Sequence, residues 1–431
     1  MALKTPQQYK DSIRAIKHRV FIAGKRIDDV TEHPNTRSTI NTIAKTYELA
    51  LDPRYEAITT ATSHLTGEKI SRWCHVPRSI DDLEKRRQMN ILMAHKIGTC
   101  HPRCGGTEAI HVLDSVTYLM DQKLGTEYHQ RFNNYLRYIQ ENDLTGNGPQ
   151  TDPKGDRSKR PSEQADPDLY LHLVEKRSDG IIVRGAKPHQ EGNFASHYHL
   201  VCPPLLSPGE GEADYALAFA VPAGADGITY ICQDGAMEAE RREAKDTRIL
   251  GNPTYGSSVS SIVIFDNVFV PWENVFMCGE IEFIGELIDR SARVHNMVCR
   301  GACKVGFMDL LIGAAQTIAE YNGISRASHV VDKITEMIRI RETTHACTTA
   351  AVLNGTEEPP GSGAYFPEVM ASLAASLNTQ YGLPQAVLLA ADLAGGLVVT
   401  MPSELELDNP ETSGYVKKYL KGVDSVSTAD R

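Results

Sequence analysis

The sequence lacks the features that would assign it to several specialised classes of protein. Its longest apolar stretch, residues 381–402, is interrupted by Gln385, Asp392 and a Gly pair, so no membrane span is expected. The N-terminus, MALKTPQQYKDSIRAIKHRV, has no signal-peptide core. Nine unevenly spaced cysteines argue against a disulfide framework, and a net charge of −10 without a basic stripe disfavours nucleic acid. We therefore expect a cytoplasmic protein without membrane or nucleic-acid partners.

The composition is that of a globular protein with more than one core. The chain has 431 residues, of which 41% are hydrophobic and 23% are charged, a balance that favours folding over disorder. A chain of this length exceeds what one ordinary hydrophobic core accommodates. We expect two or three subdomains.

Three regions differ in their hydrophobic periodicity. Over residues 5–142 apolar residues recur three and four positions apart, which predicts an all-helical N-terminal part. A boundary rich in Gly, Pro and Asp at residues 144–168 precedes short β-like runs such as SSIVIFDNVFVP, and the helical period returns from about residue 280. The prediction is an α+β protein with an N-terminal helical domain (1–145), a central β domain (146–278) and a C-terminal helical domain (279–431).

Cysteine and histidine occur at spacings that suit metal ligands. Cys100 and Cys104 form a CxxxC element, and His295, Cys299 and Cys303 follow one another at intervals of four. On an α-helix each step of four rotates by only about 40°, so these last three side chains share one face. Thiolate and imidazole groups bind zinc and iron–sulfur clusters. The alternative is that the thiols pack as small buried hydrophobes. A disulfide within the CxxxC element is less expected, because redox pairs favour CxxC.

Further segments have the composition of a cofactor site. QTDPKGDRS (residues 150–158) and VRGAKPHQEGNFASHYH (residues 183–199) combine turn-forming residues with cations, and such turns present backbone N–H groups to a phosphate or a flavin edge. The alternative is a solvated turn held by Asp side chains. In AGGLVVTMPSE (residues 394–404), Gly395 and Gly396 permit the close approach of either a cofactor or a neighbouring helix.

Longer stretches of the sequence resemble one known family. YLRYIQENDL, TDPKGDRS, DPDLYLHLVEKRSDGIIVRGAK, IVIFDNVFVP and LAGGLVVTMPSE are similar to the 4-hydroxyphenylacetate 3-hydroxylase family, and the resemblance covers nearly the whole chain. The Cys and His positions are similar to its 4-hydroxybutyryl-CoA dehydratase branch. The resemblance implies an acyl-CoA dehydrogenase-like fold with a small central β-barrel and a C-terminal helical bundle. It also implies a homotetramer that contains FAD and a [4Fe-4S] cluster.

The same resemblance implies a role for individual residues. The implied cluster ligands are Cys100, Cys104, His295 and Cys303. The implied FAD contacts are Gln150, Thr151, Asp152, Pro153, Lys154, Asp156, Arg157, His189, Gln190, Glu191, Gly395 and Gly396. The implied catalytic residues are His295, Lys304 and Glu191.

The implied reaction is the dehydration of 4-hydroxybutyryl-CoA, or of a related hydroxyacyl-CoA, to crotonyl-CoA by a radical mechanism. Isomerisation of vinylacetyl-CoA accompanies it. In this reaction an iron of the cluster acts as a Lewis acid and His295 as the base beside the thioester. The flavin makes the unactivated C–H bond breakable.

Several positions depart from the family pattern. The family's His and last Cys ligand are seven residues apart, whereas His295 and Cys303 are eight apart. Either a π-bulge absorbs the extra residue or Cys299 replaces Cys303 as the ligand. At substrate-facing positions, Glu191 stands where the family has Thr, and Pro102 where it has Gln.

The C-terminal helical bundle is expected to be truncated, because the resemblance places further helices of the family beyond Arg431.

Two other functions compete with the dehydratase. A monooxygenase that hydroxylates 4-hydroxyphenylacetate-type phenols would need FADH2 from a separate reductase and no iron. A degenerate scaffold protein would use its cysteines only for packing.

Overall fold

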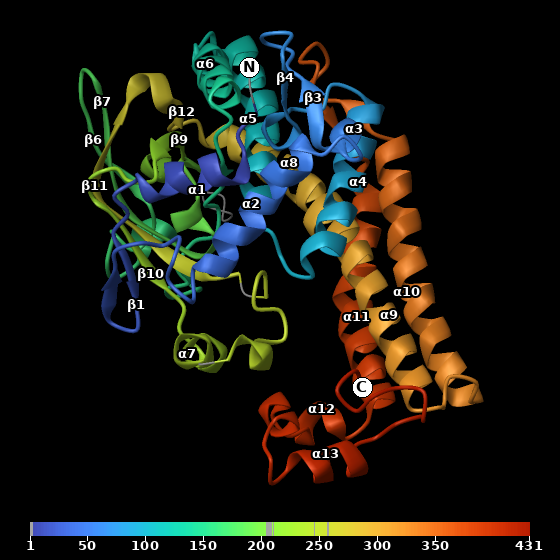
Figure 1. Cartoon of the computed structure of the whole chain (residues 1–431). Coiled ribbons are helices and arrows are strands. Elements are labelled where there is room, and N and C mark those ends of the chain that lie inside the picture. Colours follow the sequence, from blue (N-terminus) through green and yellow to red (C-terminus); the bar gives the residue numbers. More distant parts are fainter. Residues whose placement is uncertain (1–2, 204–208, 210, 245, 257) are drawn as a thin grey trace.

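Two larger β-sheets, two two-stranded sheets and a column of long helices are found in the structure, a computed structural model in which residues 3–203, 209, 211–244, 246–256 and 258–431 are described. Figure 1 shows the strands of the two larger sheets on one side and helices α9, α10 and α11 running side by side on the other. Helix α5 contacts α6 and α8 as well as strands β5, β8 and β12. It is therefore one of the elements that join the helical and β parts.

The first 145 residues are mainly helical, but they also contain four short strands. Their elements are α1 (Pro6–Arg14), β1 (Val20–Ile22), β2 (Lys25–Ile27), α2 (Arg37–Leu51), α3 (Glu56–Thr59), β3 (Thr60–Thr62), β4 (Lys69–Ser71), α4 (Ile80–Ile97), α5 (Arg103–Leu124) and α6 (Tyr128–Glu141). The prediction of an all-helical N-terminal part was wrong. Strand β1 pairs in parallel with β10 of the central region, and three-residue strands are too short to show a period in the sequence.

The central region forms two sheets that share one core. Its elements are β5 (Gly146–Asn147), β6 (His172–Lys176), β7 (Gly180–Glu191), β8 (Tyr198–Val201), β9 (Leu217–Pro222), β10 (Ile228–Cys232), α7 (Ala236–Glu243), β11 (Ser260–Pro271) and β12 (Val275–Cys278). The strand orders are β2-β1-β10-β11-β7-β6 and β12-β9-β8-β5. Phe219 of the smaller sheet and Phe265 of the larger one meet edge to face in the core between them. Among the described residues the strands of this region form these two sheets rather than one closed barrel.

The remaining chain is dominated by long helices. Its elements are α8 (Ile284–Met297), a π-helical turn (Val298–Ala302), α9 (Cys303–Tyr321), α10 (Ser328–Leu353), β13 (Thr356–Glu357), β14 (Tyr365–Phe366), α11 (Val369–Ala394), α12 (Leu397–Thr400) and α13 (Ser413–Tyr419). Helices α9, α10 and α11 pack on one another, and α9 also packs on α4. This part of the chain is therefore mainly helical.

One helical stretch of the described residues, Ile281–Tyr321, has the length and apolarity of a helix that crosses a membrane. It comprises α8, the π turn and α9, which pack on α4, α5, α10 and α11. It also contains Arg293, a buried cation that pairs with Glu358. Packing inside the protein therefore accounts for part of this apolar character.

Candidate active site

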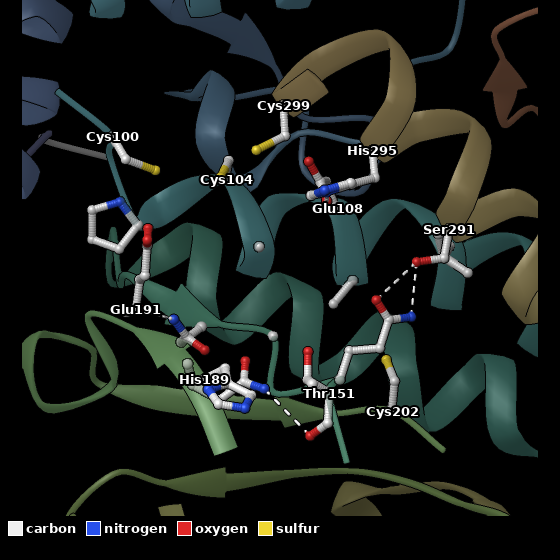
Figure 2. Close-up of a pocket in the computed structure, with 18 of the residues that line it drawn as sticks. Cys100, Cys104, Glu108, Thr151, His189, Glu191, Cys202, Ser291, His295 and Cys299 are labelled. Carbon is white, nitrogen blue, oxygen red and sulfur yellow. Dashed lines mark hydrogen bonds and ion pairs between the residues drawn. The ribbon is translucent and has the colours of Figure 1, made fainter. Parts of the chain in front are cut away.

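A cavity of about 390 Å³ lies where α5, α8 and the end of β7 meet. Its volume falls within the range of small-molecule sites. The lining contains thiols, carboxylates, imidazoles and amides in close proximity (Figure 2). The lining residues are Cys100, Pro102, Cys104, Gly105, Glu108, Ala109, Val112, Asn147, Gly148, Gln150, Thr151, His189, Gln190, Glu191, Cys202, Ser291, His295, Cys299 and Lys304.

The wall formed by α5 and the α8 segment presents two rows of side chains at helical spacing. Cys104 and Glu108 are four residues apart on α5, and His295 and Cys299 are four apart on the opposing segment. His295 Nδ1 contacts Glu108 Oε2 at 2.9 Å, and the Cys104 and Cys299 thiols are hydrogen-bonded. The two rows pair in opposite chain directions, so the segments run antiparallel along the cavity.

The pair of His295 and Glu108 forms the charged centre of this wall. The Glu108 carboxylate raises the pKa of His295 to about 9, against an opposing effect of burial. The second carboxylate oxygen of Glu108, Oε1, is buried and has no hydrogen-bond partner among the described residues. A buried acceptor of this kind is available to a ligand or a water in the cavity.

The thiols nearby differ in their ionisation because their surroundings differ. The Cys104 hydrogen bond and the charge of His295 lower the pKa of Cys299 to about 7. Burial raises the pKa of Cys303 to about 11, and burial followed by the Glu191 charge raises that of Cys100 well above its usual value. Burial lowers the pKa of Lys304, but the charges of Cys303 and the other thiols more than offset it. A cation thus stands next to a group of thiols.

The segment that precedes and begins α5 alternates between the cavity and the protein core. Cys100, Pro102 and Cys104 line the cavity, whereas His101 and Arg103 are buried on the other side. His101 and Arg103 can therefore hold the segment in the core, while Cys100, Pro102 and Cys104 remain accessible to a ligand in the cavity.

The anchors of this segment are specific. The guanidinium of Arg103 lies 4.5 Å from the ring centre of Tyr47 and donates to Thr46 Oγ1 at 2.8 Å. His101 Nε2 contacts Asn90 Oδ1 at 3.1 Å, and burial lowers the pKa of its imidazole to about 3. His101 therefore stays neutral and acts as a structural residue.

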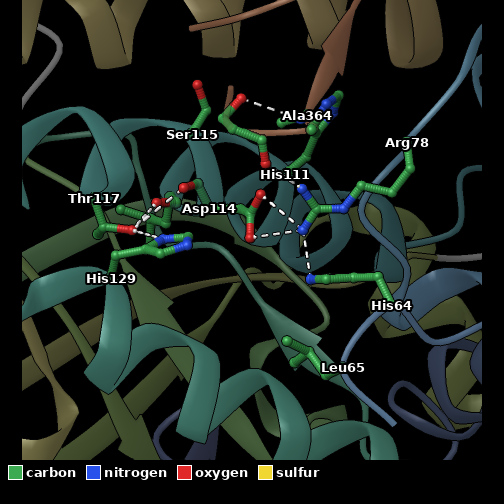
Figure 3. A network of polar contacts seen from close by, with 12 residues as sticks. His64, Leu65, Arg78, His111, Asp114, Ser115, Thr117, His129 and Ala364 are labelled. Atoms are coloured by element: carbon green, nitrogen blue, oxygen red, sulfur yellow. Dashed lines mark hydrogen bonds and ion pairs between the residues drawn. The ribbon is translucent and has the colours of Figure 1, made fainter. Parts of the chain in front are cut away.

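Helix α5 is also held along its length by buried polar contacts (Figure 3). Asp114, which is fully buried, pairs with Arg78 at 3.1 Å, and Arg78 also contacts His64. His111 Nε2 contacts the carbonyl of Tyr365 at 2.8 Å, which ties α5 to β14. These contacts fix the position of α5 and with it the row that faces the cavity.

Glycine allows the first turn of α5 to touch the backbone of the opposite wall. A Cβ at Gly106 would lie 2.2 Å from the carbonyl oxygen of Gly146, and one at Gly148 would lie 2.4 Å from that of Gly105. Neither contact leaves room for a side chain. The Gly pair that follows Cys104 therefore sets how closely the two walls of the cavity approach.

The wall opposite α8 is built from the predicted flavin segments. Gln150, Thr151, His189 and Gln190 line the cavity there, and Gln150 reaches across to Ser291 with a hydrogen bond of 2.8 Å. His189 has a φ of 57°, an uncommon conformation for a residue other than glycine that is frequent at binding sites.

About half of the residues implied by the resemblance line the cavity. Glu191 and Lys304 do, whereas Cys303 is buried behind the surface with 4% exposure. Asp152 is held away from the cavity by an ion pair with Lys187 at 2.6 Å. The others outside the lining are Pro153, Lys154, Asp156, Arg157, Gly395 and Gly396.

The expected iron–sulfur site is not visible as a ready-made metal site. Among the described residues, no group of three or more His, Cys, Asp or Glu side chains is arranged to hold a metal ion. The thiols of Cys100, Cys104 and Cys299 nevertheless lie at one end of the cavity, where Figure 2 shows the Cys299 sulfur directed toward Cys104.

The sequence did not single out Glu108, Ser291 or Asn147, although all three line the cavity. Glu108 follows Cys104 by four residues, and Ser291 precedes His295 by four. Both residues would have been found by considering the positions one helical turn away from each candidate ligand. Asn147 has no such signal, because the fold alone brings it to the cavity.

Comparison with known proteins assigns the family. Residues 5–277 match the family model of the 4-hydroxyphenylacetate 3-hydroxylase N-terminal region, and residues 284–431 match the model of its C-terminal region. The chain belongs to the 4-hydroxyphenylacetate 3-hydroxylase family. The resemblance found in the sequence is thereby confirmed.

Individual members of the family differ in their similarity to the chain. It is 41% identical to the 4-hydroxybutyryl-CoA dehydratase/vinylacetyl-CoA-Delta-isomerase of Clostridium aminobutyricum, covering 100% of this chain and 88% of the relative. It is 27% identical to the 4-hydroxyphenylacetate 3-monooxygenase oxygenase component of Geobacillus sp. (strain PA-9), covering 98% and 84%. Similarity to the dehydratase is thus the higher of these two.

Solved structures show the same order of similarity. The oxygen-tolerant archaeal 4-hydroxybutyryl-CoA dehydratase from N. maritimus superposes with a TM-score of 0.95 at 38% identity, covering 100% of this chain and 84% of that one. The oxygenase component of 4-hydroxyphenylacetate 3-monooxygenase, complexed with FAD and 4-hydroxyphenylacetate, superposes with a TM-score of 0.87 at 24% identity, covering 99% and 87%. The second likeness shows the shared fold.

Proposed function

We propose that this protein dehydrates 4-hydroxybutyryl-CoA, or a related hydroxyacyl-CoA, to crotonyl-CoA and isomerises vinylacetyl-CoA, using FAD and a [4Fe-4S] cluster. One observation carries the proposal. The thiols and the Glu108–His295 pair share one wall of a cavity whose other wall consists of the flavin segments. The full-length similarity to a dehydratase of this name supports it.

The donors present at one end of the cavity suit an iron–sulfur cluster. Cys100 and Cys104 come from the start of α5, and His295, Cys299 and Cys303 come from the facing helical segment. Thiolate and imidazole groups are the ligands that such clusters use. A cluster is larger than a single ion, so its ligands stand farther apart than those of a metal-ion site.

The opposite wall suits the isoalloxazine part of FAD. Gln150, Thr151 and Gln190 provide amide and hydroxyl groups there, and the buried Oδ1 of Asn147 has no hydrogen-bond partner among the described residues. Polar groups set around a largely enclosed cavity orient a bound cofactor. When bound, the cluster supplies Lewis acidity for the hydroxyl group and the flavin supplies electron exchange for the radical step.

The chain itself supplies proton transfer. The contact of His295 Nδ1 with Glu108 orients the imidazole and leaves Nε2 as the nitrogen that would hold iron or, when it is not bound to iron, would take or return a proton. Lys304, a cation in the lining, stabilises negative charge that develops on the substrate. Glu191 places a further carboxylate next to Cys100. We assign it to the orientation of the substrate hydroxyl.

The active form that we propose is a homotetramer. Helix α11 exposes a row of large apolar side chains to solvent, including Tyr381 and Leu388, which are 78% and 71% exposed. Apolar rows of this kind mark interaction surfaces. Gly395 and Gly396 lie at the end of the same helix, away from the cavity of their own chain. We assign their flavin contact to a neighbouring copy.

The test is a cofactor and activity measurement on protein purified without oxygen. About four irons with matching acid-labile sulfide and one flavin per chain are expected, together with the formation of crotonyl-CoA from 4-hydroxybutyryl-CoA. Protein that binds flavin but no iron, and that hydroxylates a phenol when given FADH2 and oxygen, would contradict the proposal in favour of the monooxygenase function.

A further inference from the structure

The hairpin of β13 and β14 contacts both α5 and α8, the two helices that carry the charged pair of the cavity. On α5, Ser115 Oγ donates to the carbonyl of Glu358 at 2.6 Å. On the same helix, His111 Nε2 lies 2.8 Å from the carbonyl of Tyr365. Both side chains belong to the two turns that follow Glu108. The hairpin is therefore tied to α5 close to the carboxylate that lines the cavity.

The same hairpin holds α8 through a buried pair of opposite charges. Both Nη atoms of Arg293 donate to the Glu358 carboxylate, and the bond from Nη1 to Oε1 is 2.7 Å long. A two-point contact between a guanidinium and a carboxylate fixes orientation as well as distance. Arg293 precedes His295 by two residues, a rotation of about 200° on a helix, and lies outside the cavity lining. The pair therefore holds α8 from the side that faces away from the cavity.

A phenylalanine of the hairpin is in contact with both helices. Phe366 is fully buried, and its ring stacks on the imidazole of His111 with the ring centres 4.1 Å apart. The guanidinium carbons of Arg290 and Arg293, both on α8, lie 5.9 Å and 5.7 Å from the centre of the same ring. Cations at this distance from a ring are attracted to it. The ring therefore acts as a spacer between α5 and α8.

The carboxylate of Glu358 is what connects the two buried cations of α8 to another element. Arg290 and Arg293 also contact Glu286 and Asp289, but these carboxylates belong to α8 itself and cannot hold it against a second element. Glu358 comes from the hairpin and lies within 4.0 Å of both guanidinium groups. One residue thus ties both helices, α5 through its carbonyl and α8 through its carboxylate.

We propose that Glu358 is a positioning residue for the His295–Glu108 pair. It lies outside the cavity lining and acts through α8, whose separation from α5 it fixes together with the spacer Phe366. This separation keeps His295 Nδ1 at 2.9 Å from Glu108 Oε2. The expected effect on turnover rests on the function proposed above, whereas the expected effect on this distance does not.

The crystal structure of the Glu358→Gln holoprotein tests the positioning without any measurement of activity. A neutral amide offers one acceptor oxygen and one donor, so it cannot accept from both Nη atoms of Arg293. We expect the distance between His295 Nδ1 and Glu108 Oε2 to exceed about 3.5 Å, beyond hydrogen-bonding range. A distance equal to that in the wild-type holoprotein would overturn the proposal.

Steady-state kinetics test the consequence for the reaction. In Glu358→Gln we expect kcat to fall by at least about tenfold, since a misplacement of about 1 Å can cost about 10²-fold. The KM, iron and flavin content should stay near those of the wild type, because the cavity lining is unchanged. A loss of stability alone would not separate kcat from KM in this way. Unchanged kcat would overturn the proposal.

Asp82→Asn is the matched control for the loss of a buried charge pair. Asp82 pairs at 3.0 Å with Arg72, which is as buried as Arg293, but this pair does not involve α5 or α8. The control should retain the kcat of the wild type even where its thermal stability falls. An equal loss of kcat in both variants would show a general effect of destabilisation and would overturn the proposal.

Ser115→Ala decides the question if Glu358→Gln fails to fold. This variant removes just the hydrogen bond that ties the Glu358 carbonyl to α5. A fall in kcat smaller than that for Glu358→Gln is expected, again at unchanged KM. Wild-type kcat in Ser115→Ala would overturn the proposal.

The failure of this proposal differs from the failure of the proposed function. If the wild type does not dehydrate 4-hydroxybutyryl-CoA, the proposed function is wrong, and the crystallographic distance still decides whether Glu358 positions the pair. If the wild type is active and Glu358→Gln retains both the distance and kcat, the function stands and the positioning role is wrong.

Discussion

The two faces of the helical region are built on opposite principles. Where α5 faces α8, polar and charged side chains pair within the chain, as the buried Glu108 does with the partly exposed His295. On α11 most of the buried positions are small, including Ser372, Ala375 and Gly382, and several large apolar residues are exposed. The first face pairs side chains within one chain, whereas the second leaves large apolar side chains exposed to solvent.

The difference follows from what each face must hold. A cofactor cavity needs donors in fixed positions, so the chain uses specific pairs and buried anchors such as Arg103 to set them. Helix α11 uses small residues to approach α10 closely, since a Cβ at Gly382 would lie 2.4 Å from Ile340 Cγ2. Its outer residues, Met370, Leu377 and Tyr381 among them, are then free to pack against another molecule.

The largest expected effect comes from removing a ligand at the cavity end. Cys104→Ala should lose the cluster almost completely, so that iron falls from about four per chain to near zero. The protein should remain a folded oligomer, because the α11 face is untouched. Iron analysis and visible absorbance measure the first effect, and light scattering measures the second. Cys347→Ala, on α10 and outside the cavity lining, is the control that should retain its iron. Unchanged iron in Cys104→Ala would contradict the role of this thiol.

Removing the partner of His295 should affect turnover more than binding. In Glu108→Gln the imidazole loses the charge that orients it and raises its pKa. We expect kcat to fall by about 10²-fold or more, the usual contribution of a positioned acid or base. Iron, flavin and thermal stability should stay near wild type. A variant with wild-type kcat would show that proton transfer does not pass through this pair.

Much of this site was predictable from residue spacing, because the row on each helix is a local property. Cys104 and the row from His295 to Cys303 were found in this way. A π turn was one of the two predicted explanations for the separation of eight residues between His295 and Cys303, and the structure has such a turn there. The pairing between rows was not predictable. It depends on α5 and α8 meeting antiparallel, and that contact joins residues 187 positions apart.

The fold shows the same limit. Long periodic segments such as α10 and α11 were predicted, because their pattern extends over many turns. Strands β1 and β2 were missed, since three residues on either side of the Ala23–Gly24 turn carry no period. Gly395 and Gly396 were assigned to FAD through the resemblance, and the structure places them away from the cavity of their own chain.

Charging the apolar row on α11 should separate the copies and leave the cavity intact. Tyr381→Glu places a carboxylate in the middle of the row, and we expect the interface to lose about 2 kcal/mol or more. Sedimentation velocity should then show a species smaller than the wild-type assembly. Leu124→Glu, at an exposed position at the end of α5, is the matched control and should leave the assembly unchanged. An unchanged mass in Tyr381→Glu would show that this row is not an interface.

The smallest expected effect separates a tight glycine contact from an open one. Gly106→Ala puts a methyl group 2.2 Å from the Gly146 carbonyl oxygen, so the walls of the cavity must move apart, at a cost of about 1–3 kcal/mol. Gly313→Ala, in α9 with no atom within 4 Å of the new Cβ, should instead stabilise its helix by about 0.5–1 kcal/mol. Thermal unfolding should therefore shift in opposite directions in the two variants. A shift of the same sign in both would show that the backbone contact of α5 is not as tight as the structure describes.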